Sequence, residues 1–281
     1  MTWSGMNSNG IVVFGVESNA NQPRYRNSQG EPVPTTSNCL VTKLGSFARL
    51  TQRDLACLAS LQSVTMVVEG GRELLRQGEQ GQFAYILQSG WGSSFKILQN
   101  GGKQVITFPV PGDFVCLRSV LLRTSDHSCS AITDALVSRI EIAQMLCVFN
   151  EFPLLGSAIL WATSRDEAIT VEHLANIGRR TVIERTAHFV LELEDRLKLV
   201  GLTNDAGFDC PLTQYDLADA LGLSAIHINR VLRELREINL MTFQDHKILI
   251  HDRAALKELA GYEDVDGGVA LLGGDADPAS G

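Results

Sequence analysis

Three arginines, a histidine and several hydroxyl side chains lie close together between residues 212 and 240, in the stretch LTQYDLADALGLSAIHINRVLRELREINL. Guanidinium groups neutralise phosphates and donate hydrogen bonds to base edges, and hydroxyl and imidazole groups also contact the DNA backbone. The candidates for phosphate or base-edge contacts are Thr213, Gln214, Ser224 and His227. The stretch therefore predicts a surface that binds double-stranded DNA, if its helices present these groups to solvent.

Two short helices joined by a tight turn are predicted to hold these groups. Thr213 and Asp216 have the spacing of a capping box at the start of the first helix, and Gly222 supplies the positive φ that the turn needs. Ser224 can cap a second helix that extends to about Arg236. The inward face of the first helix carries Leu217, Ala218 and Leu221.

A helical wheel divides the second helix into two faces. Its apolar stripe consists of Ile228, Val231, Leu232 and Leu235. The opposite face carries Ile226, His227, Asn229, Arg230 and Arg233. Docking in the major groove requires such an exposed face on the second helix, and the hairpin-like stretch MTFQDHKILIHD at 241–252 extends the unit. An ordinary pair of helices with a solvated basic face is the alternative.

Short alternating runs between about Leu61 and Ile142 predict a β-sandwich or β-roll. The runs span residues 63–69, 83–90, 93–98, 103–110, 129–133 and 135–142. Asn100-Gly101-Gly102 is a predicted hairpin turn between two of them, because glycine tolerates positive φ.

Helical periodicity replaces the strand pattern after Pro153. Mostly small side chains recur at alternating intervals of three and four along one seam, namely Trp161, Ser164, Ala168, Val171, Ala175 and Gly178. A close partner helix in a homodimer is the favoured interpretation, and packing against the chain's own sheet is the alternative. Thr181 and Glu184 have capping-box spacing and predict a further helix that ends near Gly201.

The composition, with 44% hydrophobic and 20% charged residues in a chain of 281, is typical of a globular protein with two compact domains. The net charge of −8 disfavours a DNA partner at first sight. However, a run of acidic residues without any basic one lies after Tyr262: Glu263, Asp264, Asp266, Asp275 and Asp277. Residues 1–36 and 263–281 are predicted to be disordered tails, because they are polar and glycine-rich without periodicity.

Several classes of function find no support in the sequence. The motifs of phosphate-binding loops, zinc peptidases and serine hydrolases are absent, so no enzyme activity is predicted. No window approaches the roughly 20 apolar residues of a membrane span, and the amino terminus lacks a secretory pattern, which predicts a cytoplasmic protein without a membrane partner. The six cysteines form no C-x-x-C pair, so no metal site is predicted.

From about Leu40 to Tyr262 the sequence resembles the Crp/Fnr family of bacterial regulators, the cyclic AMP receptor protein and FNR among them. The resemblance is strongest in the helix-turn-helix and extends to Gly90, Gly102 and the turn Pro111-Gly112-Asp113-Phe114. It implies an α+β chain with a cyclic-nucleotide-binding-like β-roll sensor, a long dimerisation helix and a winged helix-turn-helix. The implied limits of these domains are 37–155, 156–180 and 181–262.

The function implied by the resemblance is that of a DNA-binding transcriptional regulator. Such a regulator acts as a homodimer on a two-fold symmetric operator, responds to a signal at its β-roll, and has RNA polymerase as a further partner. An effector-binding module that acts on a protein partner is the alternative. DNA binding would weaken steeply with salt, which separates the two.

The resemblance also assigns roles on the second helix. In the family, an arginine at the position of Arg230 contacts a guanine in each half-site, which suits a guanidinium because it can donate to both O6 and N7. Arginine and glutamate often follow the capping serine, whereas this chain has Ala225 and Ile226 there. Ile226 could at most contact a thymine methyl group, so the operator is expected to differ from the family consensus.

The usual ligand groups of the sensor are replaced in this chain. Family members that bind cyclic AMP hold the ribose hydroxyls with a glutamate and the cyclic phosphate with an arginine. Leu117 stands in place of the glutamate, and His127, followed by Ser128, stands in place of the arginine, with Arg118 as a nearby substitute cation. A cyclic nucleotide is therefore not the expected effector, whose identity stays open.

The cysteines suggest one further signal. The oxygen-sensing branch of the family holds an iron–sulfur cluster with a tight amino-terminal cysteine group, whereas Cys39 stands alone before Cys57, so no cluster is expected. Cys116 lies in the effector loop and Cys129 follows it, which allows a redox-sensing hypothesis if Arg118 or His127 stabilises a thiolate. The alternative is that both cysteines are small buried apolar residues.

Overall fold

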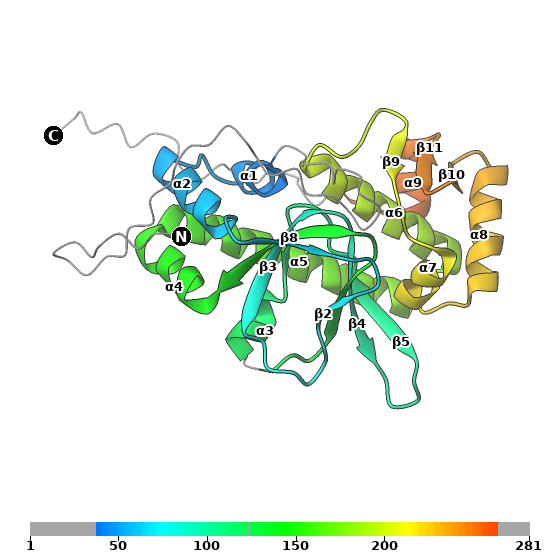
Figure 1. Ribbon diagram of the computed structural model, residues 1–281. Coiled ribbons are helices and arrows are strands. Elements are labelled where there is room, and N and C mark those ends of the chain that lie inside the picture. Colours follow the sequence, from blue (N-terminus) through cyan, green and yellow to red (C-terminus); the bar gives the residue numbers. More distant parts are fainter. Residues whose placement is uncertain (1–37, 123, 264–281) are drawn as a thin grey trace, which may run out of the picture.

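The computed structural model describes residues 38–263 except residue 123, and Figure 1 labels its elements. The helices are α1 (Cys39–Gly45), α2 (Gln52–Leu61), α3 (Leu117–Leu122), α4 (Ile142–Glu151), α5 (Pro153–Arg179), α6 (Val182–Leu199), α7 (Gln214–Leu221), α8 (Ala225–Glu237) and α9 (Arg253–Ala260). The strands are β1 (Thr65–Val68), β2 (Glu73–Leu75), β3 (Phe83–Ser89), β4 (Gly92–Ile97), β5 (Lys103–Thr107), β6 (Phe114–Val115), β7 (Ser128–Ala131), β8 (Ala135–Glu141), β9 (Gly207–Asp209), β10 (Met241–Gln244) and β11 (Lys247–Ile250). This order confirms the predicted α+β fold class. The two predicted tails lie outside the described residues, Glu263 apart.

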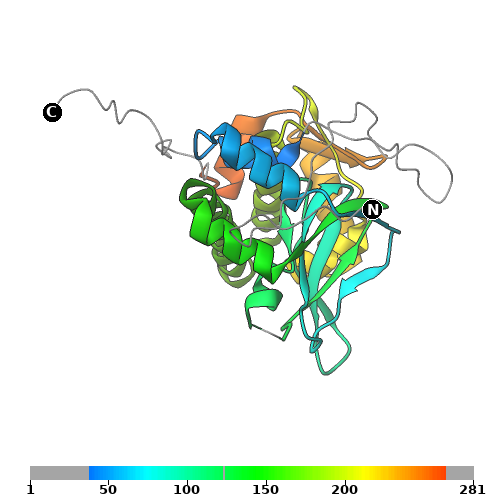
Figure 2. The same ribbon diagram turned by 60° about the vertical axis from the view of Figure 1, so that its left-hand side comes forward.

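The β-rich half consists of two antiparallel four-stranded sheets, with the strand orders β1-β8-β3-β6 and β2-β7-β4-β5. Figure 2 shows these strands, drawn cyan to green, beside the blue and green helices. Each alternating run of the sequence contains a strand. The run at 103–110 ends early, because Pro109 and Pro111 lack the N–H that a sheet ladder needs. β2 and β6 escape prediction because they have only three and two residues.

Two glycines noted in the sequence are required by the close approach of other chain segments. Gly90 has φ +85°, and a Cβ there would lie 2.5 Å from the carbonyl oxygen of Asp134. Gly112 has φ +93°, and a Cβ there would lie 3.0 Å from the backbone of Cys39 in α1. A larger residue at either position would push these segments apart, so the glycines fix how the roll closes and how α1 docks on it.

The sequence analysis identifies no helix before Pro153, whereas the structure has α1, α2, α3 and α4 there. A capping box between Glu141 and Gln144 starts α4, and Met145 and Val148 are buried on its inner face. None of the described helices is by itself long and apolar enough to cross a membrane; α4 and α5 meet the length and composition test only as a pair, bent by 119°.

Helix α5 has one face buried against the chain and one exposed. The predicted seam lies on the exposed face from Ser164 to Gly178, where Val171 is 59% and the neighbouring Leu174 74% exposed. The alternative interpretation, in which this part of the seam packs against the chain's own sheet, is therefore wrong. Trp161 differs from the rest of the seam, because it is half-buried and stacks on Phe47 with ring centroids 5.2 Å apart.

The C-terminal unit follows the predicted order. The capping box of Thr181 and Glu184 starts α6, and Gly201 with φ +75° follows its end. The predicted hairpin is β10–β11, which pairs with β9 in a three-stranded sheet. Its turn residues Asp245 and His246 have φ of +52° and +57°, the conformation of a type I′ turn. This hairpin is the wing beside α7 and α8.

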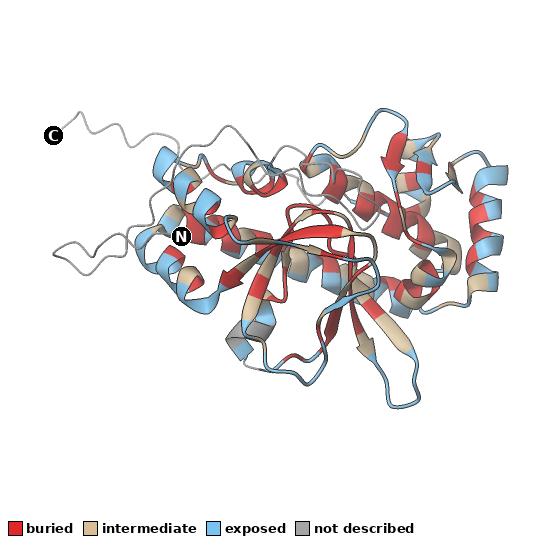
Figure 3. Ribbon diagram, viewed as in Figure 1, coloured by how far each residue is buried: buried red, intermediate tan, exposed pale blue. Residues whose placement is uncertain are grey.

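One hydrophobic cluster joins the two halves, and Figure 3 shows buried positions running from the strands into the C-terminal helices. Phe95, Val105 and Phe108 of the β-roll belong to the same cluster as Phe189 of α6 and Leu221 of α7. Strand β5 lies against α7. The sensor half and the helix-turn-helix therefore share a core and are not linked by α5 alone.

Candidate DNA-binding surface and sensor cavity

Helix α8 is fixed at its start and along its inner face. The Ser224 hydroxyl accepts the N–H of His227 at 3.3 Å, and Gly222 takes the left-handed conformation with φ +64°, both as predicted. The whole predicted apolar stripe is buried, namely Ile228, Val231, Leu232 and Leu235. Packing of this stripe decides which residues face outward.

The outer face of α8 is open to solvent. Ile226 is 80% exposed, and His227, Asn229, Arg230 and Arg233 are exposed as well. Arg233 Nε lies 3.8 Å from Glu237 Oε1. Within residues 38–263, Arg230 has neither an ion pair nor a side-chain hydrogen bond. The guanidinium of Arg230 is therefore available to a ligand.

The residues predicted around α7 differ in how freely they could contact DNA. The Thr213 hydroxyl donates to Asp216 Oδ2 at 2.6 Å and accepts the Asp216 N–H, so its capping box is confirmed and the hydroxyl is occupied. Gln214 is half-buried at the first position of the helix. Tyr215 is 74% exposed, and the sequence analysis misses it. The sequence signal for Tyr215 is an aromatic residue that follows the N-cap of α7 but does not belong to the apolar inward face of that helix.

The C-terminal end of α7 is bound by two other elements. Arg185 Nη1 of α6 donates to the Leu221 carbonyl at 2.7 Å, and Gln104 Nε2 of β5 donates to the Ala220 carbonyl at 3.1 Å. Carbonyls in the last turn of a helix have no partner within the helix, so they accept such donors. These bonds tie the helix-turn-helix both to α6 and to the β4–β5 hairpin of the sensor.

A cavity of about 450 Å³ lies between the β-roll and α5. Three of the four predicted effector residues, Cys116, Arg118 and His127, line it. Ser128 is not among the lining residues, and its hydroxyl accepts the N–H of Gln77 at 3.0 Å. The cavity is therefore the place where the sensor could hold a small molecule.

Two positions of this cavity carry residues other than those that the resemblance associates with a cyclic nucleotide. Leu117 offers no side-chain acceptor for ribose hydroxyls. His127 Nδ1 lies 2.8 Å from Asp126 Oδ1, and Arg118 Nη2 lies 2.8 Å from the same oxygen. One carboxylate thus already faces both of these side chains.

The cysteines do not fit an iron–sulfur cluster. No cysteine precedes Cys39, which is buried at the start of α1. Among the described residues, no group of three or more histidine, cysteine or acidic side chains could hold a metal ion. The tight amino-terminal cysteine group that such a cluster needs is missing from this sequence.

A mostly buried set of charges connects the sensor to α5 and α6, and we call it the junction cluster. Its members are Lys43, Asp113, Asp166, His173, Glu192 and Arg196. Asp113 lies at its centre, 2.7 Å from Lys43 Nζ and 2.8 Å from Arg196 Nη2. Arg196 also donates to Glu192 at 3.2 Å and to the Phe108 carbonyl at 2.9 Å. These contacts join α1, the Pro-Gly-Asp-Phe turn and α6.

The charges of the junction cluster stabilise one another. Burial would raise the pKa of Glu192, but the charges of His173 and Arg196 and their hydrogen bonds lower it to about 2. Burial would lower the pKa of His173, but Glu192 raises it above its usual range. Lys43 and Arg196 likewise hold the pKa of Asp113 below its usual range despite burial. The sequence analysis misses this cluster, except that it singles out the turn containing Asp113.

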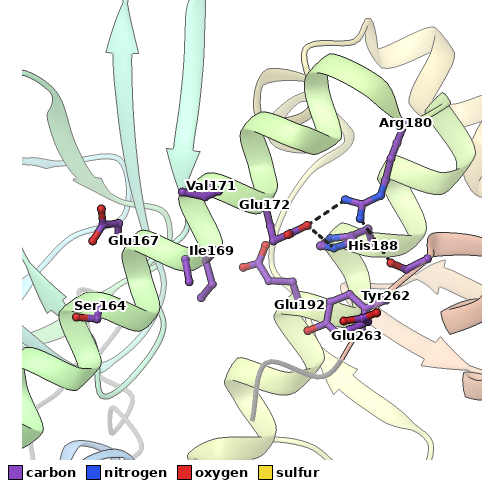
Figure 4. A pocket seen from close by; sticks show the side chains of 12 residues that line it. Ser164, Glu167, Ile169, Val171, Glu172, Arg180, His188, Glu192, Tyr262 and Glu263 are labelled. Atoms are coloured by element: carbon purple, nitrogen blue, oxygen red, sulfur yellow. Dashed lines mark hydrogen bonds and ion pairs between the residues drawn. The ribbon is translucent and has the colours of Figure 1, made fainter. Parts of the chain in front are cut away.

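A second cavity, of about 700 Å³, lies between α5, α6 and the segment that follows α9 (Figure 4). Arg180 and His188 point toward Glu172, with N–O distances of 3.2 Å and 3.5 Å. Burial, and then the charge of Arg180, lowers the pKa of His188 to about 4, so this imidazole is neutral near pH 7. Ser164 and Val171 also line the cavity, so it adjoins the exposed seam of α5.

Two family models match the two halves of the chain. Residues 65–152 match a cyclic nucleotide-binding domain, and residues 184–259 match a Crp-like helix-turn-helix domain. The anaerobic regulatory protein of Aggregatibacter actinomycetemcomitans is 24% identical over 224 residues, which cover 80% of this chain and 87% of that protein. The transcriptional activator protein FnrL of Cereibacter sphaeroides is 24% identical over 238 residues, or 83% and 94% of the two chains.

The fold has the same relatives. FixK2 from Bradyrhizobium japonicum superposes with a TM-score of 0.63 at 23% identity, covering 70% of this chain and 96% of that one. A Crp-family regulator from Thermus thermophilus, TTHB099, gives a TM-score of 0.58 at 20% identity, covering 73% and 100%. In this chain a domain of the cyclic nucleotide-binding type precedes a Crp-like helix-turn-helix domain. The relatives of the chain are regulators and not enzymes. The protein therefore belongs to the Crp/Fnr family of DNA-binding transcriptional regulators.

Proposed function

We propose that the chain binds a two-fold symmetric DNA operator as a homodimer, with α8 of each subunit in the major groove. The observation that carries this proposal is the outer face of α8, which is exposed while the opposite stripe is buried. Arg230 stands on that face without a partner among the described residues, so none of the bonds described there has to break when it binds DNA. Family membership supports this function over that of a module acting on a protein partner.

The residues of this surface divide into base readers and positioning groups. We assign Arg230 to a guanine through two hydrogen bonds, and Ile226 to contact with a thymine methyl group. Of the remaining predicted residues, Gln214, Ser224, His227, Asn229 and Arg233 contact phosphates or base edges in this proposal, whereas the Thr213 hydroxyl stays in its capping box with Asp216. Tyr215 joins them because it is exposed at the start of α7. Ala225 cannot donate a hydrogen bond to a base, so the operator departs from the family consensus.

The homodimer is proposed to form through the exposed face of α5. Small residues from Ser164 to Gly178 allow a second helix to approach closely, and Val171 and Leu174 supply apolar area. In this arrangement the sensor covers residues 37–155, the dimerisation helix 156–180 and the DNA-binding unit 181–262. Introducing a charge with Ala168→Glu is expected to give monomers in sedimentation experiments, and an unchanged dimer would remove α5 as the interface.

We propose the cavity lined by Cys116, Arg118 and His127 as the effector site, for a small molecule other than a cyclic nucleotide. Support comes from its place between the β-roll and α5, where a ligand touches both the sensor and the dimer helix. RNA polymerase is the proposed partner of the DNA-bound dimer, because one relative is named as a transcriptional activator. The cytoplasm is the proposed location, since a bacterial regulator meets its DNA there.

Selection of bound DNA from a random pool, with and without cell extract, tests the operator and the effector together. We expect an enriched inverted repeat with a guanine in each half-site. A gel shift of that repeat at about 50 mM and about 200 mM salt should then show a loss of affinity of two or more orders of magnitude, because phosphate contacts release counterions. No enrichment under either condition, or binding that salt does not weaken, would overturn the proposal.

A further inference from the structure

Two thiols meet at the wall of the β-roll cavity, where Cys116 lines the space and Cys129 lies behind it. Cys116 directly follows β6 and Cys129 lies in β7, and their side chains interact within one buried cluster. Cys129 has two further polar neighbours. Its Sγ lies 3.3 Å from Ser94 Oγ, and His127 forms a side-chain hydrogen bond with it. Within an otherwise apolar cluster, Cys129 thus has two polar partners that an inert buried cysteine lacks.

A relay of polar groups activates one of the two thiols. Asp126 Oδ1 accepts a hydrogen bond from His127 Nδ1 at 2.8 Å, and His127 contacts the Cys129 thiol. A thiol beside a base that a carboxylate orients is the usual arrangement of an activated cysteine. The hydrogen bond from Cys116, together with that from His127, lowers the pKa of Cys129 against the effect of burial, and the same contact raises the pKa of Cys116. The two directions favour a thiolate on Cys129 over one on Cys116.

One thiol of the pair, Cys116, lines the cavity of about 450 Å³. Cys129 is 1% exposed and lies behind its neighbours Ser94, Cys116 and His127, which all line this space. A hydroperoxide is small enough to enter a cavity of that size. Cys116 also has φ +62°, a conformation that residues other than glycine seldom adopt. The position of this side chain is therefore set by the surrounding structure and not by its own backbone preference.

We propose that Cys116 and Cys129 form a reversible redox site, which hydroperoxides oxidise to a disulfide. With hydrogen peroxide, the Cys129 thiolate attacks one oxygen, the O–O bond breaks, and the hydroxide released takes a proton from His127 and leaves as water. The sulfur of Cys116 then attacks the sulfenic acid on Cys129, the S–S bond forms, and the hydroxyl group leaves with the Cys116 proton as a second water. The two thiols lose two electrons in total, which reduce the peroxide. A dithiol reductant reverses the step by thiol–disulfide exchange.

Peptide mapping of the full-length protein tests the proposal. Trypsin cuts after Arg118, Arg123 and Arg139, so the two cysteines fall on separate peptides, 104–118 and 124–139. After treatment with about one equivalent of hydrogen peroxide and alkylation of the remaining thiols, we expect these peptides to be disulfide-linked. Dithiothreitol should release them. In Cys116→Ser the expected product is a sulfenic acid on Cys129 that dimedone traps, and Cys147→Ser, at an exposed cysteine, should leave the link unchanged.

The role of His127 has its own readout. In the native protein the rate of oxidation should stay nearly constant from pH 6 to pH 8, because Cys129 is already a thiolate. In His127→Gln the rate should rise by up to about tenfold per pH unit over this range, as for a cysteine of ordinary pKa. The proposal is overturned if oxidation falls first on Cys147 or links Cys57 to Cys147 while Cys116 and Cys129 remain open to alkylation. It is overturned equally if the linked peptides form but dithiothreitol does not release them.

Discussion

Arg230 on α8 and Arg196 in the junction cluster carry the same charged group in opposite surroundings. Arg230 is exposed and has no partner within the described residues, whereas Arg196 is 6% exposed and bonded to Asp113, Glu192 and a backbone carbonyl. A buried guanidinium is tolerated only when its hydrogen bonds are satisfied. The comparison teaches that arginines on this chain divide into those that fix the fold and those that are left for a ligand.

The largest expected effect is the loss of folding stability when the buried Arg196 is replaced. Arg196→Met leaves Glu192 and Asp113 buried with one cation fewer, so the free energy of unfolding should fall by about 3–5 kcal/mol. Urea denaturation measures this change. The matched control is Arg233→Met, whose exposed pair with Glu237 should contribute almost nothing to stability. Equal effects of the two substitutions would break the comparison.

The next effect is on binding and not on stability. Arg230→Ala should weaken binding of the selected operator by about 1–3 kcal/mol, because two hydrogen bonds to a guanine are lost. Gel-shift titration measures the affinity, and an unchanged urea midpoint shows that the fold is spared. Arg72→Ala, at an exposed arginine of the β-roll, serves as the control. Full operator affinity in a folded Arg230→Ala protein would exclude this residue as the reader.

A smaller effect should appear as a pH dependence of the junction cluster. The pKa of His173 is raised in the fold, so its contribution is fully present below its unfolded pKa of about 6.5 and is lost as the pH rises through the folded pKa. The free energy of unfolding should therefore fall above pH 6.5, by at most about 1.4 kcal/mol per pH unit. His173→Gln should reduce this slope, and the part that remains belongs to His127, whose pKa is also raised. An undiminished slope in the variant would assign it to groups other than His173.

The smallest effect concerns the turn that aims α8. Gly222→Ala meets no atom within 4 Å, but it places a Cβ at φ +64°, so it should cost about 1 kcal/mol of folding free energy. Ser224→Ala, which removes the cap of α8 without straining the backbone, is the companion variant and should cost a similar amount. Thermal unfolding resolves changes of this size. A cost above about 3 kcal/mol for Gly222→Ala would show that the turn carries tertiary contacts as well.

The DNA-binding surface could be predicted because its signals are local. Thr213, Asp216 and Gly222 act within a single helix, and the buried stripe of α8 follows from helical spacing. The junction cluster could not be predicted from the sequence, because two of its ion pairs join residues that are 70 and 83 positions apart and no periodicity marks them. Strand β6 could not be predicted either, because its two residues form a strand only by pairing with β3. Trp161 fits the spacing of the seam, but its ring stacks on Phe47 and is half-buried.

The bond between Gln104 and the Ala220 carbonyl spans 116 residues, and the shared hydrophobic cluster spans a similar distance. During synthesis, strand β5 therefore leaves the ribosome well before the helix that covers it. At roughly 5–20 residues per second, the delay is roughly 6 to 23 seconds. Over that interval the apolar side chains of the β4–β5 hairpin lack their final partners. The β4–β5 part of the sensor core therefore cannot be completed until α6 and α7 have emerged.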